Sequence, residues 1–246
     1  PNLAGVLIVG LGCERNQVAG LVDAQGLKGG RLMRTLVMQE VGGTRATIEA
    51  AAQSGVRHLT LIPTDTFPMD SSDEASTVLF QFLRSHGETF RHLSLRFSAH
   101  GELSRLPLEL QNKLSAMQAA SAHELGMGLS LLLGYSGRRD LLRVARELAA
   151  EVKAGRLPAD AISPTLIQQR LVTASLPPVD LILYTGRGQD LADALTFESA
   201  YAEFGFAHCL WPDFTPQDLQ HALADFGLRE RRFGKTSAQV QTATPS

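Results

Sequence analysis

Short apolar runs rich in β-branched residues alternate along the chain with longer segments whose apolar residues recur every three or four positions. The short runs stop at glycine, proline or polar residues, which is the pattern of buried strands in a parallel sheet. Predicted strands cover residues 5–12, 35–38, 56–62, 91–97, 127–133 and 180–184. The longer segments, several of which begin at a capping residue, predict helices. These helices cover residues 45–54, 72–86, 108–122, 138–154, 164–174, 197–206 and 216–226.

The order of these elements determines the expected fold class. Strands that alternate with helices favour an α/β fold with a mostly parallel sheet flanked by helices. With 246 residues, 44% of them hydrophobic, the chain is long enough to bury a sizeable core. Residues 236–246 contain few apolar side chains and predict a disordered tail.

Charge and cysteine content narrow the classes of partner. The chain has 23 Lys and Arg against 25 Asp and Glu, a net charge of −2, so we expect no general nucleic-acid-binding surface. Its apolar runs fall well short of the roughly 20 residues that a transmembrane helix needs. Cys13 and Cys209 lie far apart in the sequence, which favours free thiols in a reducing, cytoplasmic location.

Seven short motifs, in order along the chain, resemble those of the cis-prenyltransferases, the undecaprenyl diphosphate synthase family. They lie within residues 44–235 and are Gly55–Leu61, Leu106–Pro107, Gly134–Asp140, Asp180–Leu181, Ala200–Glu203, Leu210–Phe214 and Arg229–Gly234. Each motif alone is weak evidence, but seven in the same order are typical of common descent. We therefore predict a cis-prenyltransferase-like domain over residues 50–235.

The resemblance implies a transferase that condenses isopentenyl diphosphate onto an allylic diphosphate, with magnesium on the phosphates. It also implies a homodimer, or a heterodimer with a related subunit, and membrane contact only at the periphery, through the lipid substrate. The residues that match substrate-binding positions of the family are Arg138, Arg187, Arg232 and Gly234. Glu203 matches a metal-associated carboxylate, although an ion pair is an equally good interpretation of it.

Several positions depart from the family pattern. The family's metal-binding Asp after the first strand is missing, and Gly10–Arg15 stands in its place. Two phosphate-binding arginines are replaced by Tyr184 and Asp190. An acidic residue in place of a phosphate-binding arginine makes the free energy of phosphate binding less favourable by several kcal/mol in order of magnitude, because repulsion replaces attraction. The activity is therefore in doubt, and a non-catalytic partner subunit of a prenyltransferase is the alternative.

The N-terminal segment, residues 1–49, resembles a different family, the altronate and galactarate dehydratases. The resemblance rests on polar residues after the predicted first two strands: Cys13, Glu14, Asn16, Gln17 and Gln39. It implies a chimera-like chain, in which a dehydratase-like segment supplies the first strands of the sheet. A remnant of a metal-dependent sugar-acid dehydratase, with iron or manganese, is the second alternative. For Cys13 and Glu14 a packed turn is the simpler interpretation, because two ligands do not make a metal site.

Overall fold

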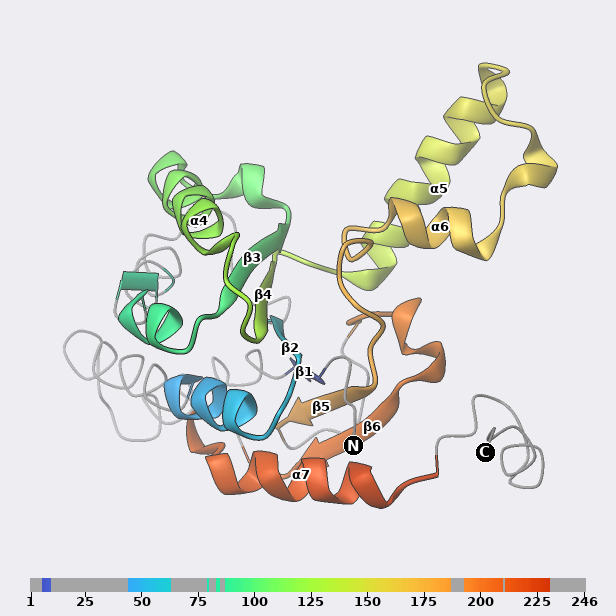
Figure 1. Ribbon diagram of the computed structural model, residues 1–246. Coiled ribbons are helices and arrows are strands. Elements are labelled where there is room, and N and C mark those ends of the chain that lie inside the picture. Colours follow the sequence, from blue (N-terminus) through green and yellow to red (C-terminus); the bar gives the residue numbers. More distant parts are fainter. Residues whose placement is uncertain are drawn as a thin grey trace, which may run out of the picture.

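In the part of the chain that the structure describes, six parallel strands form one sheet at the centre of the molecule (Figure 1). The computed structural model describes residues 6–9, 44–62, 79, 83–84, 87–186, 193–209 and 211–230. The strands are β1 (Val6–Val9), β2 (His58–Ile62), β3 (Arg96–Gly101), β4 (Gly128–Leu133), β5 (Leu181–Thr185) and β6 (Glu203–Ala207). Their order across the sheet is β3-β4-β2-β1-β5-β6, and every neighbouring pair is parallel. The predicted α/β class with a parallel sheet is confirmed.

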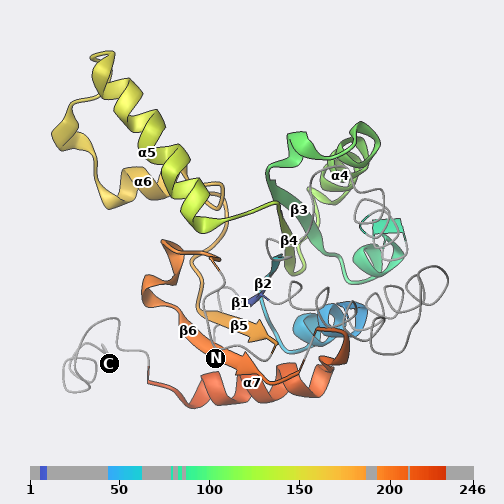
Figure 2. The same cartoon turned by 180° about the vertical axis from the view of Figure 1, so that it is seen from behind.

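One face of the sheet, which we call the first face, is covered by a helix over residues 44–53, by α4 (Leu108–Ser121) and by α7 (Pro216–Leu228). Leucines that alternate along the central strands point into this layer and are almost fully buried: Leu59, Leu61, Leu129 and Leu131. Both cartoon views place α7 along the edge that ends in β6 (Figures 1 and 2). This layer contains the largest buried apolar cluster among the described residues.

The opposite, second face has a smaller core around Leu132, Ile182 and Tyr184. Beyond it α5 (Gly137–Lys153) and α6 (Pro164–Arg170) form an arm that projects from the sheet in both views (Figures 1 and 2). The arm has its own apolar contacts, in which Val144 and Leu148, four residues apart on α5, share a cluster with residues of α6.

Most predicted elements occur within two or three residues of their expected bounds, but three predictions are wrong. Residues 87–92 are helical, so β3 begins at Arg96 instead of residue 91, and α6 ends at Arg170 instead of residue 174. The helix predicted over 197–206 is a short 3-10 turn (Glu198–Tyr201) followed by β6. The physical reason is that residues 203–207 alternate phenylalanines with other residues, which suits a strand paired to β5. The predicted strand at 35–38 and the predicted tail lie outside the described residues.

Candidate functional site

The carboxyl ends of β1 and β5 meet at one edge of the sheet. Val9, the last residue of β1, is paired with Tyr184 near the end of β5. The helix that follows β1 in the described chain lies on the first face, whereas Ala194 and Leu195, which follow β5, lie on the second. In parallel α/β sheets, ligands bind outside the carboxyl ends of strands whose connections diverge in this way. The candidate site therefore lies at the carboxyl ends of β1 and β5.

Most of the residues predicted for the site lie outside the described part of the chain. Cys13, Glu14, Asn16 and Gln17 follow β1 in the sequence, Arg187 follows β5, and Gln39, Arg232 and Gly234 lie elsewhere. Because no contact of these residues is described, their roles stay predictions. Of the predicted site residues, the structure describes Arg138 and Glu203.

Tyr184 occupies the strand position at which the resemblance expects a phosphate-binding arginine. The residue is buried, with 5% of its surface exposed. Its ring stacks on two phenylalanines of β6, at centroid distances of 6.4 Å to Phe204 and 5.6 Å to Phe206. Such ring pairs stabilise packing beyond the area they bury. Tyr184 therefore serves the contact between β5 and β6, and it supplies no positive charge at this end of the strand.

Arg138 lies in the first turn of α5, beside the chain that follows β5. Its backbone N–H donates to Asp193 Oδ1 at 3.1 Å, and the Ser136 hydroxyl donates to Asp193 Oδ2 at 2.5 Å. Ser136 also caps the helix by accepting a hydrogen bond from the N–H of Arg139. Neither Ser136 nor Asp193 was predicted for the site from the sequence. The available signal was a serine directly before an amphipathic run, which is typical of a helix N-cap.

Glu203 lies away from this edge, because it is the first residue of β6 and is paired with the first residue of β5. Its carboxylate Oε2 forms an ion pair with Nη1 of Arg229 at 3.2 Å. The same guanidinium donates to the carbonyl of Phe204 at 2.7 Å and binds Asp225. The ion pair that we weighed for Glu203 is thus present, and its role as a metal ligand stays a prediction. Within the described ranges, no group of three His, Cys, Asp or Glu residues could hold a metal ion.

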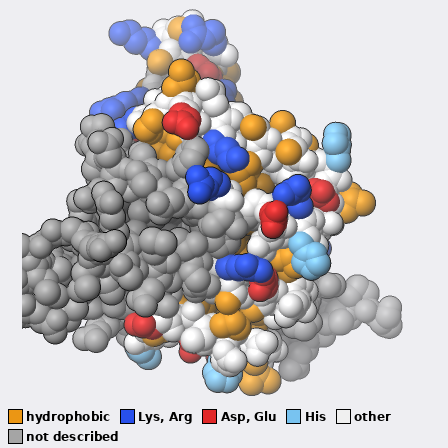
Figure 3. Space-filling view, turned by 90° about the vertical axis from the view of Figure 1, so that its left-hand side faces the viewer, with side chains coloured by type: hydrophobic (Ala, Val, Ile, Leu, Met, Phe, Trp, Pro, Cys, Tyr) orange, Lys and Arg blue, Asp and Glu red, His pale blue; other side chains and the backbone are white. Residues whose placement is uncertain are grey.

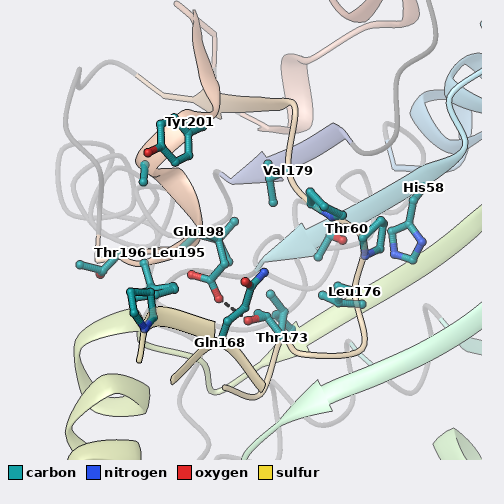
Figure 4. A pocket seen from close by; sticks show the side chains of 16 residues that line it. His58, Thr60, Gln168, Thr173, Leu176, Val179, Leu195, Thr196, Glu198 and Tyr201 are labelled. Atoms are coloured by element: carbon teal, nitrogen blue, oxygen red, sulfur yellow. Dashed lines mark hydrogen bonds between the residues drawn. The ribbon is translucent and has the colours of Figure 1, made fainter. Parts of the chain in front are cut away.

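A mostly apolar pocket of about 620 Å³ opens on the second face, near the amino ends of β2, β5 and β6 (Figure 4). Leu132, Leu176 and Val179 belong to its walls, and Tyr201 stands at one side of it. Glu198 points between α6 and the chain that follows it, where its carboxylate accepts a hydrogen bond from Thr173. Burial raises the pKa of the Glu198 carboxyl, and the bond from Thr173 offsets part of this effect. This pocket lies near the amino ends of these strands, whereas a diphosphate is expected at the carboxyl ends of β1 and β5.

A chain of hydrogen bonds crosses three strands on the same face. His58 Nε2 lies 2.9 Å from Ser130 Oγ, which lies 2.6 Å from Ser98 Oγ, which in turn lies 3.0 Å from His100 Nε2. Burial, followed by the charge of Arg96 and the nearby His100, lowers the pKa of His58 to about 4. A neutral His58 ring that is bonded to the buried Ser130 is consistent with a structural role for this histidine.

No charge of one sign dominates the described part of the face shown in Figure 3. On the face in Figure 3, acidic and basic side chains alternate with hydrophobic ones over the described part. Among the described residues, no helix combines the length and apolar character needed to cross a bilayer.

Comparison with protein families yields two matches. A family model described as putative undecaprenyl diphosphate synthase matches residues 38–234. A model described as the second domain of D-galactarate dehydratase/altronate hydrolase matches residues 1–60. The two matched ranges overlap over residues 38–60, and the second is confined to the N-terminal quarter of the chain.

Curated relatives cover nearly the whole chain. A ditrans,polycis-undecaprenyl-diphosphate synthase ((2E,6E)-farnesyl-diphosphate specific) from Pseudomonas aeruginosa is 38% identical over 211 residues, 84% of each protein. The synthase of the same description from Xanthomonas axonopodis pv. citri is 33% identical and covers 91% of this chain and 90% of its own. An isoprenyl transferase from Chlorobaculum tepidum is 32% identical over 82% of this chain and 78% of its own.

Solved structures show the same fold. Lavandulyl diphosphate synthase from Lavandula x intermedia, in complex with dimethylallyl diphosphate, superposes with a TM-score of 0.80 at 28% identity, over 95% of this chain and 99% of its own. A probable undecaprenyl diphosphate synthase from Campylobacter jejuni superposes with a TM-score of 0.69 at 22% identity, over 96% of this chain and 100% of its own.

Proposed function

Because the chain belongs to the undecaprenyl diphosphate synthase (cis-prenyltransferase) family, we propose that it binds isoprenoid diphosphates and condenses them much more slowly than a member that has both phosphate-binding arginines. The substrates are isopentenyl diphosphate and an allylic diphosphate. The binding place is the carboxyl edge of β1 and β5, with Arg138 at the start of α5 as one cationic contact.

Three observations support diphosphate binding by this chain. The described residues that follow β1 and β5 pack on opposite faces of the sheet, and in α/β proteins ligands bind outside strand ends of this kind. The structural neighbour with a TM-score of 0.80 was solved with dimethylallyl diphosphate. Arg138 is exposed and lies at the amino end of a 17-residue helix, where the helix dipole also favours an anion.

The observation that supports slow condensation is the packing of Tyr184. Ionisation of an allylic diphosphate leaves negative charge on the departing group, and arginines stabilise that charge in the transition state. The Tyr184 ring is buried against Phe204 and Phe206. At this position β5 therefore carries a packed aromatic ring in place of a guanidinium that could bind phosphate. Asp190, six residues further along the chain, adds a negative charge at the other replaced position.

Magnesium is part of this proposal as the ion that would neutralise the diphosphate. The described residues contain no group of three candidate ligands, and Glu203 is held by Arg229, so we derive no step from a protein-bound ion. A cytoplasmic dimer is proposed with it, on the family resemblance alone.

Calorimetric titration tests the binding directly. Farnesyl diphosphate and isopentenyl diphosphate are titrated into the full chain in magnesium buffer, with farnesol as the control that lacks the diphosphate. We expect the diphosphates to bind and farnesol to bind at least about tenfold more weakly. Arg138→Ala should weaken diphosphate binding, whereas Arg146→Ala, which removes an exposed arginine further along α5, should leave it unchanged. A wild-type chain that binds no diphosphate would refute the proposal.

The packing of Tyr184 also favours a second candidate, a non-catalytic subunit that supports an active cis-prenyltransferase. In that case the isolated chain gives no product, but its addition to a related catalytic subunit raises the turnover of that subunit. Titration of the chain into such a subunit, with product formation as the readout, distinguishes the two candidates.

The N-terminal family match motivates a third candidate, a remnant of a metal-dependent dehydratase. It requires iron or manganese binding that Cys13→Ala abolishes. Equilibrium dialysis of the metal against wild-type and variant protein tests this candidate, and equal binding by the two would exclude it.

A further inference from the structure

One aspartate of the chain after β5 is bonded to the start of α5, which carries the predicted substrate-binding Arg138. Asp193 receives three hydrogen bonds from three consecutive residues at the start of α5, the N-cap residue and the first two residues of the helix. Ser136 Oγ and the N–H of Arg138 bond to its carboxylate, and the N–H of Gly137 donates to its backbone carbonyl at 2.8 Å. These bonds join the chain after β5 to the start of α5 through both the side chain and the backbone of one residue.

The start of α5 and the chain after β5 also approach each other closely at Gly137. A Cβ atom added at Gly137 would lie 2.5 Å from Thr196 Oγ1 and 2.7 Å from Thr196 N. Glycine is therefore required at this point for the two segments to approach so closely. The Gly134–Asp140 motif thus supplies both the hydrogen-bond donors and the space for the chain after β5.

The backbone conformation at this point depends on the same contacts. Asp193 has a φ of +54° and Leu195 a φ of +49°, values that residues other than glycine seldom adopt. Such conformations persist where surrounding contacts enforce them. The three hydrogen bonds to Asp193 are contacts of this kind.

We infer that Asp193 is a positioning residue, which holds the chain after β5 against the start of α5 and thereby places Arg138 relative to the end of β5. The clamp consists of Ser136, Gly137, Arg138 and Asp193. The inference rests on the proposed function for its link to substrate, since it assigns the aspartate a role in diphosphate binding without contact to the ligand.

Two substitutions at one position separate the clamp from the charge. Asp193→Asn keeps an oxygen that accepts from the N–H of Arg138 and an amide group beside Ser136, but it removes the negative charge. Asp193→Ala removes the side-chain half of the clamp. Asp160→Ala, which removes an exposed acid at the far end of the arm, is the matched control.

The test combines farnesyl diphosphate titration with hydrogen exchange of residues 134–140 in the full chain. We expect Asp193→Ala to weaken binding about tenfold to a hundredfold, because small displacements of positioning groups have effects of this size, and to speed exchange at the start of α5. Asp193→Asn should keep the wild-type affinity for farnesyl diphosphate and the wild-type exchange rate at the start of α5. Asp160→Ala should change neither quantity. Should Asp193→Ala fail to fold, Ser136→Ala removes one clamp donor and should give the same changes to a smaller degree.

Two results would overturn the inference. One is an Asp193→Ala variant with wild-type binding and exchange. The other is an Asp193→Asn variant that is as impaired as Asp193→Ala, because the charge and not the clamp would then matter. A wild-type chain that binds no diphosphate would refute the proposed function instead, and the exchange of residues 134–140 would then decide alone whether Asp193 holds the two segments together.

Discussion

His58 connects the stability of the sheet to pH. The pKa of its imidazole is lowered from 6.5 to about 4, first by burial and then by Arg96 and His100. Protonation therefore occurs in the unfolded chain at a higher pH than in the folded chain. The contribution of neutral His58 to stability is present above about pH 6.5 and is lost as the pH falls toward about 4.

The size of this effect follows from the shift. The full difference between the pKa of His58 in the unfolded chain and in the folded chain corresponds to at most about 3 kcal/mol in the free energy of unfolding. About 2 kcal/mol of this is lost between pH 7 and pH 5. His58 is partly exposed, and solvent screening reduces the value. We therefore expect the free energy of unfolding to decrease by about 1 kcal/mol through His58 over this interval.

Urea unfolding at pH 7 and pH 5 measures the effect. His58→Gln cannot take up a proton but keeps an amide near Ser130. From pH 7 to pH 5 its free energy of unfolding should therefore fall by about 1 kcal/mol less than that of the wild type. His123→Gln, which changes an exposed histidine, should follow the wild type. An identical pH dependence in wild type and His58→Gln would show that the folded and unfolded chains protonate His58 alike, and would refute the reasoning.

Two further substitutions test the packing. Gly137→Ala should destabilise the fold by about 1–3 kcal/mol through the contact with Thr196; urea unfolding should show no such loss for Gly87→Ala, where an added Cβ meets nothing within 4 Å. Trp211→Phe should cost about 1–3 kcal/mol, because it leaves a cavity and removes the 2.9 Å hydrogen bond from the indole to the buried Thr44 hydroxyl. Equal melting of the wild type and Trp211→Phe would show that neither the indole bond nor the lost volume matters.

The sequence predicted the central strands well because strands buried on both faces are continuous apolar runs. The segments Gly128–Leu133 and Leu181–Thr185 are of this kind, and every residue in them is buried. The edge strand β6 was mistaken for part of a helix, because its residues are only partly buried and the apolar run is missing. Edge strands carry less of this signal than central ones.

The contacts of the candidate site could not be predicted in the same way. The bond from Arg138 to Asp193 joins residues 55 positions apart, and it depends on how two connections meet at the sheet edge. The resemblance identified Tyr184 as a replaced arginine, but its stacking between two phenylalanines required the register of β5 and β6. Sequence patterns report local periodicity, whereas these contacts arise only after the sheet has formed.

The rate of prenyl transfer from labelled isopentenyl diphosphate, measured with a panel of allylic diphosphates and magnesium, shows whether the two replaced arginines limit catalysis. We expect slow or undetectable product formation by the wild type and at least a tenfold gain in the double variant Tyr184→Arg/Asp190→Arg, because phosphate contacts are restored. Tyr184→Phe, which keeps the ring stack, should behave like the wild type. Rapid turnover by the wild type, or a correctly folded double variant with no gain, would contradict the claim that these two replacements limit catalysis.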